Sequence, residues 1–206
     1  MTLRLQDGSF DALIFDCDGT LVDTAPAHYR ALSRALDRHH LQMDAAWYFA
    51  RVGLTPAALL DAYESSFGLL PVPRKELMRS YTEAYQSAIG ELQEITIVAT
   101  VARQWKGRVP MAVASNGERE NVVGSLRSAG LLDLFDHVVA AEDVSRGKPS
   151  PDLFLEAAQR MQVAPGRCLV LEDSDEGVSA SQSAGMAVVD VRESWTPAWK
   201  QNVIDF

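Results

Sequence analysis

The sequence predicts an α/β protein, a doubly wound parallel sheet into which an all-helical segment is inserted. Three observations carry this prediction. Five short apolar runs are bounded by turn residues, and helical stretches separate them. One interval, between the first run and the second, is about 90 residues long, far beyond an ordinary crossover. Strands alternating with helices are typical of a parallel sheet with right-handed crossovers.

Each apolar run is rich in Val, Ile, Leu or Ala and is apolar on both faces, as strands of a covered parallel sheet are. The expected strands are residues 10–15, 109–115, 138–141, 168–171 and 187–191. Helix signals lie between them, because Gly130 and Gly185 each follow a helical stretch and Pro151 opens another. The helices expected around the sheet are residues 96–106, 118–129, 151–161 and 175–184.

The long interval between the first two strands is almost wholly helical in pattern. Its expected helices are residues 26–39, 56–67 and 74–89, each following a Thr or Pro suited to a helix start. These helices exceed what one face of a five-stranded sheet holds. We therefore interpret residues 25–93 as a helical cap, and residues 1–24 and 94–206 as the α/β core. The alternative is a set of extra helices packed on that core.

Composition and charge exclude several classes of protein. The 206 residues include 19 Lys and Arg against 28 Asp and Glu, a net charge of −9, which disfavours binding to a nucleic-acid backbone. Two cysteines form no disulfide scaffold, residues 1–8 lack the apolar stretch of a secretory signal, and no apolar run is long enough to span a bilayer. We expect a cytoplasmic protein without nucleic-acid or membrane partners. We also expect a monomer, because a site covered by its own cap needs no partner.

Two carboxylates follow the first expected strand directly, in the segment Asp16-Cys17-Asp18-Gly19-Thr20. Residues i and i+2 of an extended chain emerge on the same side, so Asp16 and Asp18 are expected to face one site. Adjacent anions repel, and burying them requires a cation or a shared proton. The simpler alternative is a solvated Asx turn.

Polar residues also follow the next two strands, where α/β sheets bind ligands. The second strand ends in Ser115-Asn116-Gly117, which offers a hydroxyl and backbone N–H groups to an anion, or simply caps a helix. The third leads to Lys148, in a loop stiffened by prolines. Taken alone, such a lysine is usually solvated.

The fourth strand ends in Glu172-Asp173-Ser174. Hard oxygen ligands at the end of a buried strand, facing another carboxylate pair, are what Mg²⁺ requires. We therefore expect Mg²⁺ to bind where the first and fourth expected strands end.

The ordered set Asp16-x-Asp18-Gly19-Thr20, Ser115, Lys148-Pro149 and Glu172-Asp173 resembles the four motifs of the haloacid dehalogenase superfamily. The position of the helical insert and the phrases Gly-Lys-Pro-Ser-Pro-Asp and Glu-Asp-Ser resemble its β-phosphoglucomutase-like branch. Within that branch the likeness is greatest to bacterial sugar-phosphate phosphatases of the fructose-1-phosphate type. The resemblance covers nearly the whole chain and implies hydrolysis of a small phosphate monoester.

The resemblance also implies a role for each motif residue. Asp16 would be the nucleophile that forms an aspartyl-phosphate, and Asp18 the general acid and then the base. Mg²⁺ would be held by the Asp16 carboxylate, the Asp18 carbonyl and Asp173, with Glu172 close by or coordinating. Phosphoryl oxygens would be held by three further residues, namely Lys148, Ser115 and the amide of Asn116.

Two residues of the helical insert are further candidates. His28 matches a histidine near the active site of β-phosphoglucomutase-like proteins, although a helix-surface histidine often has no role. Gly53 begins the segment Gly53-Leu54-Thr55-Pro56, where mutases of this branch carry a Gly-x-Ser followed by an arginine for a second phosphate. Pro56 stands where that arginine would fall, which favours a phosphatase over a mutase.

Other functions remain open from the sequence. Arg51, Arg74, Lys75 or Arg79 could replace the mutase arginine in space. A phosphonatase would need a Schiff-base lysine in the cap, for which Lys75 is the one candidate between residues 25 and 93. A dehalogenase would lack the second aspartate. A phospho-accepting receiver module, which is no enzyme, carries its acidic pair before the phospho-accepting strand and has no helical cap.

Overall fold

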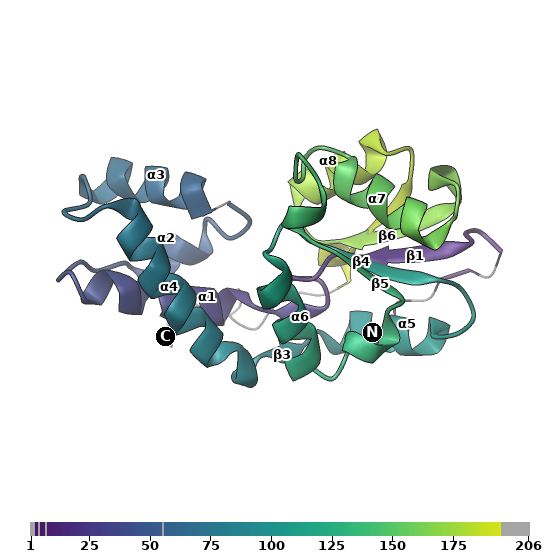
Figure 1. Ribbon diagram of the computed structural model, residues 1–206, viewed down its shortest axis with the longest axis horizontal. Helices are drawn as coiled ribbons and strands as arrows, with labels where there is room; N and C mark the ends of the chain where they lie inside the picture. The colour runs from purple at the N-terminus through teal and green to yellow at the C-terminus, as the bar shows by residue number, and fades with distance from the viewer. Residues whose placement is uncertain (1–2, 4, 7, 55, 195–206) are drawn as a thin grey trace. The chain divides into compact units, whose positions relative to one another are not determined.

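The chain forms two compact units in a computed structural model that describes residues 3, 5–6, 8–54 and 56–194. The core unit comprises the described residues up to Thr24 and from Glu91 onward. The helical unit is Ala25–Gly90. Figure 1 shows the strands gathered in the core unit and helices α1 to α4 in the other.

A five-stranded parallel sheet lies at the centre of the core unit, which confirms the predicted fold class. Its strands are β1 (Ala12–Phe15), β4 (Met111–Ala114), β5 (His137–Val139), β6 (Cys168–Glu172) and β7 (Ala187–Asp190). The order is β5-β4-β1-β6-β7, so β1 is central and the chain crosses over on both sides of it. Both neighbours of β1 run parallel to it, which brings their carboxyl ends to one edge.

Helices cover both faces of this sheet (Figure 1). On one face lie α5 (Thr96–Trp105) and α6 (Arg119–Ser128), and on the other α7 (Asp152–Met161) and α8 (Asp175–Ser183). The predicted helices agree with these within three residues at each end. Short 3₁₀ turns connect the elements at Leu132–Leu134, Ala141–Asp143, Pro165–Arg167 and Val191–Glu193.

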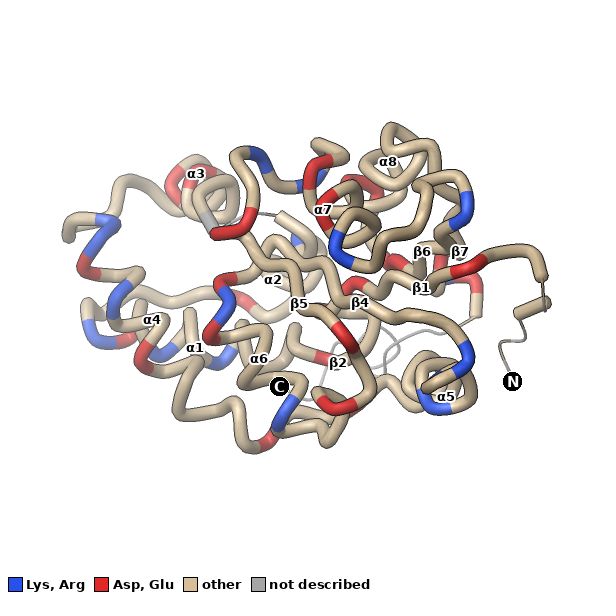
Figure 2. Tube along the Cα trace, turned by 45° about the vertical axis from the view of Figure 1, so that its right-hand side comes forward, with Lys and Arg blue, Asp and Glu red and all other residues tan. Residues whose placement is uncertain are grey.

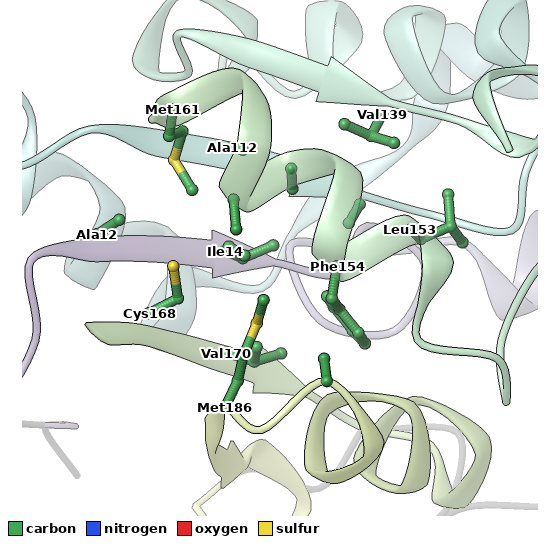
Figure 3. Close-up of a cluster of buried hydrophobic side chains, with 14 of the residues drawn as sticks. Ala12, Ile14, Ala112, Val139, Leu153, Phe154, Met161, Cys168, Val170 and Met186 are labelled. Atoms are coloured by element: carbon green, nitrogen blue, oxygen red, sulfur yellow. The ribbon is translucent and has the colours of Figure 1, made fainter. Parts of the chain in front are cut away.

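Apolar side chains of the strands and of α7 form one continuous cluster on this second face (Figure 3). Ile14 and Val170 come from adjacent strands, and Phe154 projects from α7 into the cluster. All three are fully buried, and burying one such side chain contributes about 1.5–3 kcal/mol. Packing on this scale holds the strand ends, and the polar residues that follow them, in fixed positions.

A second, two-stranded sheet joins β2 (Val22–Asp23) to β3 (Gln93–Glu94) in antiparallel register. It pairs the segments of the core unit that lie next to the helical unit in sequence. No pattern in the sequence indicates this pairing, because each strand has two residues.

The helical unit contains α1 (Ala25–Asp37), α2 (Ala45–Phe49), α3 (Pro56–Phe67) and α4 (Arg74–Ala88), followed by a 3₁₀ turn at Ile89–Glu91 that reaches the boundary. Leu32, Leu36 and Leu77 lie in its apolar cluster, while both signs of charge occur along α1 and α4 (Figure 2). The short helix α2 was not predicted. Asp44 caps it by accepting a hydrogen bond from the Trp47 N–H at 2.8 Å.

Among the described residues, no helix is both long and apolar enough to cross a membrane.

Candidate active site

The predicted site residues of the core unit converge at the carboxyl ends of β1, β4 and β6. Asp16 follows β1 directly, Ser115 follows β4, and Glu172 is the last residue of β6. β1 lies between the other two strands. The topology therefore brings together three side chains that are separated by up to 156 residues in the sequence (172 − 16).

Lys148 lies between two carboxylates at the centre of this site. Its Nζ donates to Oδ1 of Asp16 at 2.5 Å and to Oε2 of Glu172 at 2.7 Å. Its side chain is 4% exposed, and its ammonium also lies 4.9 Å from the centre of the Phe154 ring. A lysine this deeply buried remains charged because it is paired. Lys148 is therefore a buried member of the site and not the solvated loop lysine that the sequence alone would favour.

The electrostatics of the site follow from burial and crowding. Burial raises the pKa of the Asp16 carboxyl well above its ordinary value, and the Glu172 carboxylate adds to the rise while Lys148 opposes it. Burial likewise raises the pKa of Asp173, to about 7, with Glu172 again contributing. Burial alone would lower the pKa of Lys148, but Asp16 and Glu172 outweigh that effect and raise it. The acidic groups thus exceed what one lysine neutralises.

Glu172 also orders the start of α8. Its Oε1 accepts hydrogen bonds from the backbone N–H groups of Asp173 and Ser174 and from the Ser174 hydroxyl, each at 2.9 Å. Ser174 caps α8 by accepting from the Gly177 N–H at 3.0 Å. A Cβ at Gly177 would collide with the Glu172 carboxylate. Glycine at this position therefore makes room for the buried acid.

Asp173 is held against the loop that follows β1. The Thr20 hydroxyl donates to its Oδ1 at 2.8 Å, and Thr20 is fully buried. Gly19 has a φ of 91°, in the left-handed region that favours glycine, and a Cβ there would collide with the Asp173 carboxylate. Cys17 closes this loop, because its carbonyl accepts from the N–H groups of Leu21 and Val22 at 3.0 Å each.

Asp18 and Ser115 lie together at the end of β4. The Ser115 hydroxyl donates to Oδ2 of Asp18 at 3.3 Å and accepts from the Gly117 N–H at 3.0 Å. Ser115 is 1% exposed, and Asp18 is half-buried. The second aspartate is therefore the more accessible of the pair.

Asn116 is directed at the lysine loop. Its side-chain Oδ1 accepts from the Lys148 backbone N–H at 2.8 Å, and its Nδ2 donates to the Lys148 carbonyl at 3.3 Å. This side-chain amide is engaged by the protein itself. Any phosphate contact from Asn116 is left to its backbone N–H.

The residues present fit a divalent cation. Asp16, Glu172 and Asp173 can each offer one carboxylate oxygen, and these atoms lie within 4.8 Å of one another. Three hard oxygen donors with excess negative charge suit Mg²⁺ or a similar ion. Coordination by the Asp18 carbonyl stays a prediction.

The two candidates outside the core, His28 and Gly53, belong to the helical unit. The Nδ1 atom of His28 lies 2.7 Å from the hydroxyl of Tyr81, and its ring stacks on Tyr85 with centroids 4.1 Å apart. Gly53 is exposed in a turn and has a φ of 103°. Their part in substrate binding stays a prediction.

From the sequence, no role was assigned to the supporting residues of the site, although Thr20 and Ser174 stand within its motifs. Thr20, Ser174 and Gly177 hold the acidic residues, and Phe154 lies beneath the lysine. A signal existed for Ser174, since a serine three residues before Gly177 at a strand end is typical of a helix N-cap. None existed for Phe154, which reads as an ordinary apolar residue of α7.

Comparison with known proteins identifies the family. Residues 10–185 match the family model described as haloacid dehalogenase-like hydrolase. The chain belongs to the haloacid dehalogenase-like hydrolases. The matched segment contains every core site residue described above, from Asp16 to Asp173.

Relatives of this hydrolase include the fructose-1-phosphate phosphatase YqaB of Escherichia coli K12, which is 39% identical over 89% of this chain and 97% of its own length. The β-phosphoglucomutase of Bacillus subtilis is 30% identical over 87% of this chain and 82% of its own. A haloacid dehalogenase family hydrolase of Deinococcus radiodurans, solved with bound phosphate and sodium, is 31% identical with a TM-score of 0.71, covering 88% of this chain and 80% of that one. These matches support the predicted superfamily and its β-phosphoglucomutase-like branch.

Proposed function

We propose that this hydrolase is a Mg²⁺-dependent phosphatase that cleaves a small sugar phosphate through an aspartyl-phosphate on Asp16. One observation carries the proposal. The buried Asp16 carboxylate lies beside a charged lysine and two further acids, with Asp18 and Ser115 paired at the same sheet edge. A carboxylate nucleophile, a proton donor and a set of charge-neutralising groups are what phosphate ester hydrolysis requires.

In the first step, a carboxylate oxygen of Asp16 attacks the phosphorus atom and the bond to the sugar oxygen breaks. Asp18 donates a proton to the departing alkoxide, as a general acid. The half-burial of Asp18 suits this role, because the leaving group must reach it.

In the second step, Asp18 has lost its proton and acts as the base. It takes a proton from a water molecule, which attacks the phosphorus of the aspartyl-phosphate and releases inorganic phosphate. Asp16 is regenerated as a carboxylate. The same residue therefore serves in both halves of the reaction.

The phosphoryl oxygens are held by positive charge and donors at the strand ends. We assign this task to the Lys148 ammonium, the Ser115 hydroxyl and the Asn116 backbone N–H, which lie in the loops that follow β4 and β5. Asp16, Glu172, Asp173 and the Asp18 carbonyl would hold Mg²⁺. When bound, the ion neutralises the crowded carboxylates and the phosphoryl oxygens.

The names of the relatives support a sugar phosphate as substrate. YqaB acts on fructose 1-phosphate and matches this chain over nearly its full length. We further propose that residues 25–93 act as a cap over the site, contributing His28 and Gly53 to substrate binding. Cytoplasmic location stays a prediction from composition, and a monomeric state stays a prediction from the cap, because a capped site needs no partner.

A screen of phosphate release tests this proposal. The purified chain is incubated with fructose 1-phosphate, other hexose and pentose phosphates, and p-nitrophenyl phosphate, with Mg²⁺ or with EDTA. We expect release from at least one sugar phosphate, dependent on Mg²⁺. Full activity in EDTA would contradict the metal assignment, and no release from any ester would contradict the function.

A phosphomutase is the second candidate, because the β-phosphoglucomutase of Bacillus subtilis is 30% identical. Two observations favour hydrolysis. Pro56 replaces the expected arginine, and one cap arginine that could substitute, Arg74, is already paired with Glu64 and Asp61. Phosphorus NMR with β-glucose 1-phosphate and a bisphosphate primer decides between them. Accumulation of glucose 6-phosphate faster than inorganic phosphate would establish the mutase.

A further inference from the structure

The side-chain amide of Asn116 makes a two-point contact with the backbone of Lys148. Oδ1 accepts from the Lys148 N–H at 2.8 Å, and Nδ2 donates to the Lys148 carbonyl at 3.3 Å. Two hydrogen bonds to the same residue fix the orientation of its backbone as well as its distance. Asn116 thus links the end of β4 to a residue 32 positions further along the chain.

Gly147 is shaped to this contact. A Cβ at this position would collide with the Asn116 Oδ1 and lie 3.1 Å from its Cγ. The φ of Gly147 is not positive, so the backbone conformation at this position does not require glycine. The close approach of the Asn116 amide is therefore the feature that excludes a side chain there.

The loop that carries Lys148 is otherwise exposed to solvent. Arg146, Gly147 and Pro149 are exposed, whereas the Lys148 side chain is 4% exposed and its Nζ must reach both Asp16 and Glu172. A lysine has four side-chain torsions, so the ammonium is placed accurately only if the backbone from which it starts is fixed. Asn116 follows Ser115, whose own backbone is bonded to Val139 of β5 at 3.0 Å.

We propose that Asn116 is a positioning residue for Lys148, and that its side chain acts on the reaction through the lysine rather than by touching the phosphoryl group. This inference rests on the proposed function for its activity readout. A displaced ammonium would weaken phosphoryl stabilisation, and a shift of about 1 Å in such a group lowers turnover by about a hundredfold.

A double-mutant cycle of Asn116→Ala and Lys148→Ala tests the route of action. We expect Asn116→Ala alone to lower kcat by about tenfold or more, and to change kcat by less than about twofold when Lys148 is already alanine. An equal loss in both backgrounds would overturn the proposal, because it would mean that the Asn116 side chain acts independently of the lysine.

A second cycle, of Gly147→Ala with Asn116→Ala, tests the contact and keeps the lysine intact. Gly147→Ala should lower kcat in the natural chain, because its methyl group displaces the amide. The same change should have little effect once Asn116 is alanine, since the colliding atoms are gone. Additive losses would overturn the proposal.

Acetylation of lysines, followed by mass spectrometry, reads the position of Lys148 without any substrate. Asn116→Ala should raise the rate at Lys148 at least fivefold and leave Lys106, an exposed lysine, unchanged at an unchanged melting temperature. An unchanged acetylation rate at Lys148 would overturn the proposal. This test also decides if Lys148→Ala leaves too little turnover for the first double-mutant cycle. If the natural chain hydrolyses no ester, the proposed function is wrong. The acetylation result then still shows whether Asn116 positions Lys148.

Discussion

The ammonium of Lys148 lies 2.5 Å from Oδ1 of Asp16, and the two side chains are only 4% and 9% exposed. The same ammonium lies 2.7 Å from Glu172, which is 1% exposed. Three charged groups are therefore buried together, and the two carboxylates share this one lysine. Removing the lysine should therefore lower the stability of the fold as well as the activity.

Lys148→Met should destabilise the protein by about 3–5 kcal/mol in EDTA at pH 7, because it leaves two carboxylates buried without their cation. Urea unfolding measures the loss. Lys106→Met is the matched control, since Lys106 is exposed and its ammonium donates to the backbone carbonyl of Leu134, and a change within about 0.5 kcal/mol is expected. Equal stability of the two variants would contradict the buried ion pair.

Gly19→Ala should abolish most of the activity, because its methyl group collides with the Asp173 carboxylate. Gly107→Ala is the control. Gly107 also has a positive φ, of 75°, but a Cβ there meets nothing within 4 Å. Both variants should lose about 1 kcal/mol of stability from backbone strain. Only Gly19→Ala should require a higher Mg²⁺ concentration for half-maximal activity, and a similar requirement in both would contradict the account.

Asp143→Asn should lower stability in a pH-dependent way. Although burial alone would raise the pKa of Asp143, the Ala140 N–H together with Arg160 and Arg119 lowers it below the ordinary 3.8. A lowered pKa stabilises the fold above the ordinary value, and that contribution is lost as the pH falls through the lowered value. The variant should therefore be about 1 kcal/mol less stable at pH 7, with the difference shrinking below about pH 4.

Urea unfolding at several pH values measures this difference. Asp133→Asn, at an exposed position of the neighbouring 3₁₀ turn, is the control and should change stability by less than about 0.5 kcal/mol at pH 7. A loss at Asp143 that stayed constant down to pH 3 would point to packing rather than charge.

Asp18→Asn should discriminate between substrates by their leaving groups. Without a proton donor, the loss should be greatest for sugar phosphates, whose alkoxides leave poorly, and small for p-nitrophenyl phosphate. Steady-state kcat on both esters measures the ratio. Equal losses on the two esters would argue against the general-acid role.

The sheet and the residues at its strand ends were predictable because the strand signals are local, and because the motifs at the strand ends, each weak alone, occur together in order. Continuous apolar runs mark β1, β4 and β6, and parallel strands must bring their carboxyl ends to one edge. The convergence of Asp16, Ser115 and Glu172 follows from that rule. The full set of motifs in order then identifies the family.

The remaining features depend on contacts that no local pattern reveals. The pairing of Val22 with Glu94 joins two strands of two residues each, which the whole helical unit separates in the sequence. The contact between Asn116 and the Lys148 backbone, and the room that Gly177 leaves for Glu172, exist only once the chain has folded. Helix α2 was missed because five residues are too few for a periodic pattern, although its cap, Asp44, was visible.

Capture of the phosphorylated residue tests the central claim most directly. The chain is mixed with Mg²⁺ and the sugar phosphate that it hydrolyses fastest, quenched in acid within milliseconds, and treated with borohydride, which reduces an acyl phosphate of aspartate to homoserine. Mass spectrometry should then find homoserine at position 16, only with both Mg²⁺ and substrate present, and never in Asp16→Asn. Rapid phosphate release by an enzyme that shows homoserine at no position, or at a position other than 16, would contradict the account.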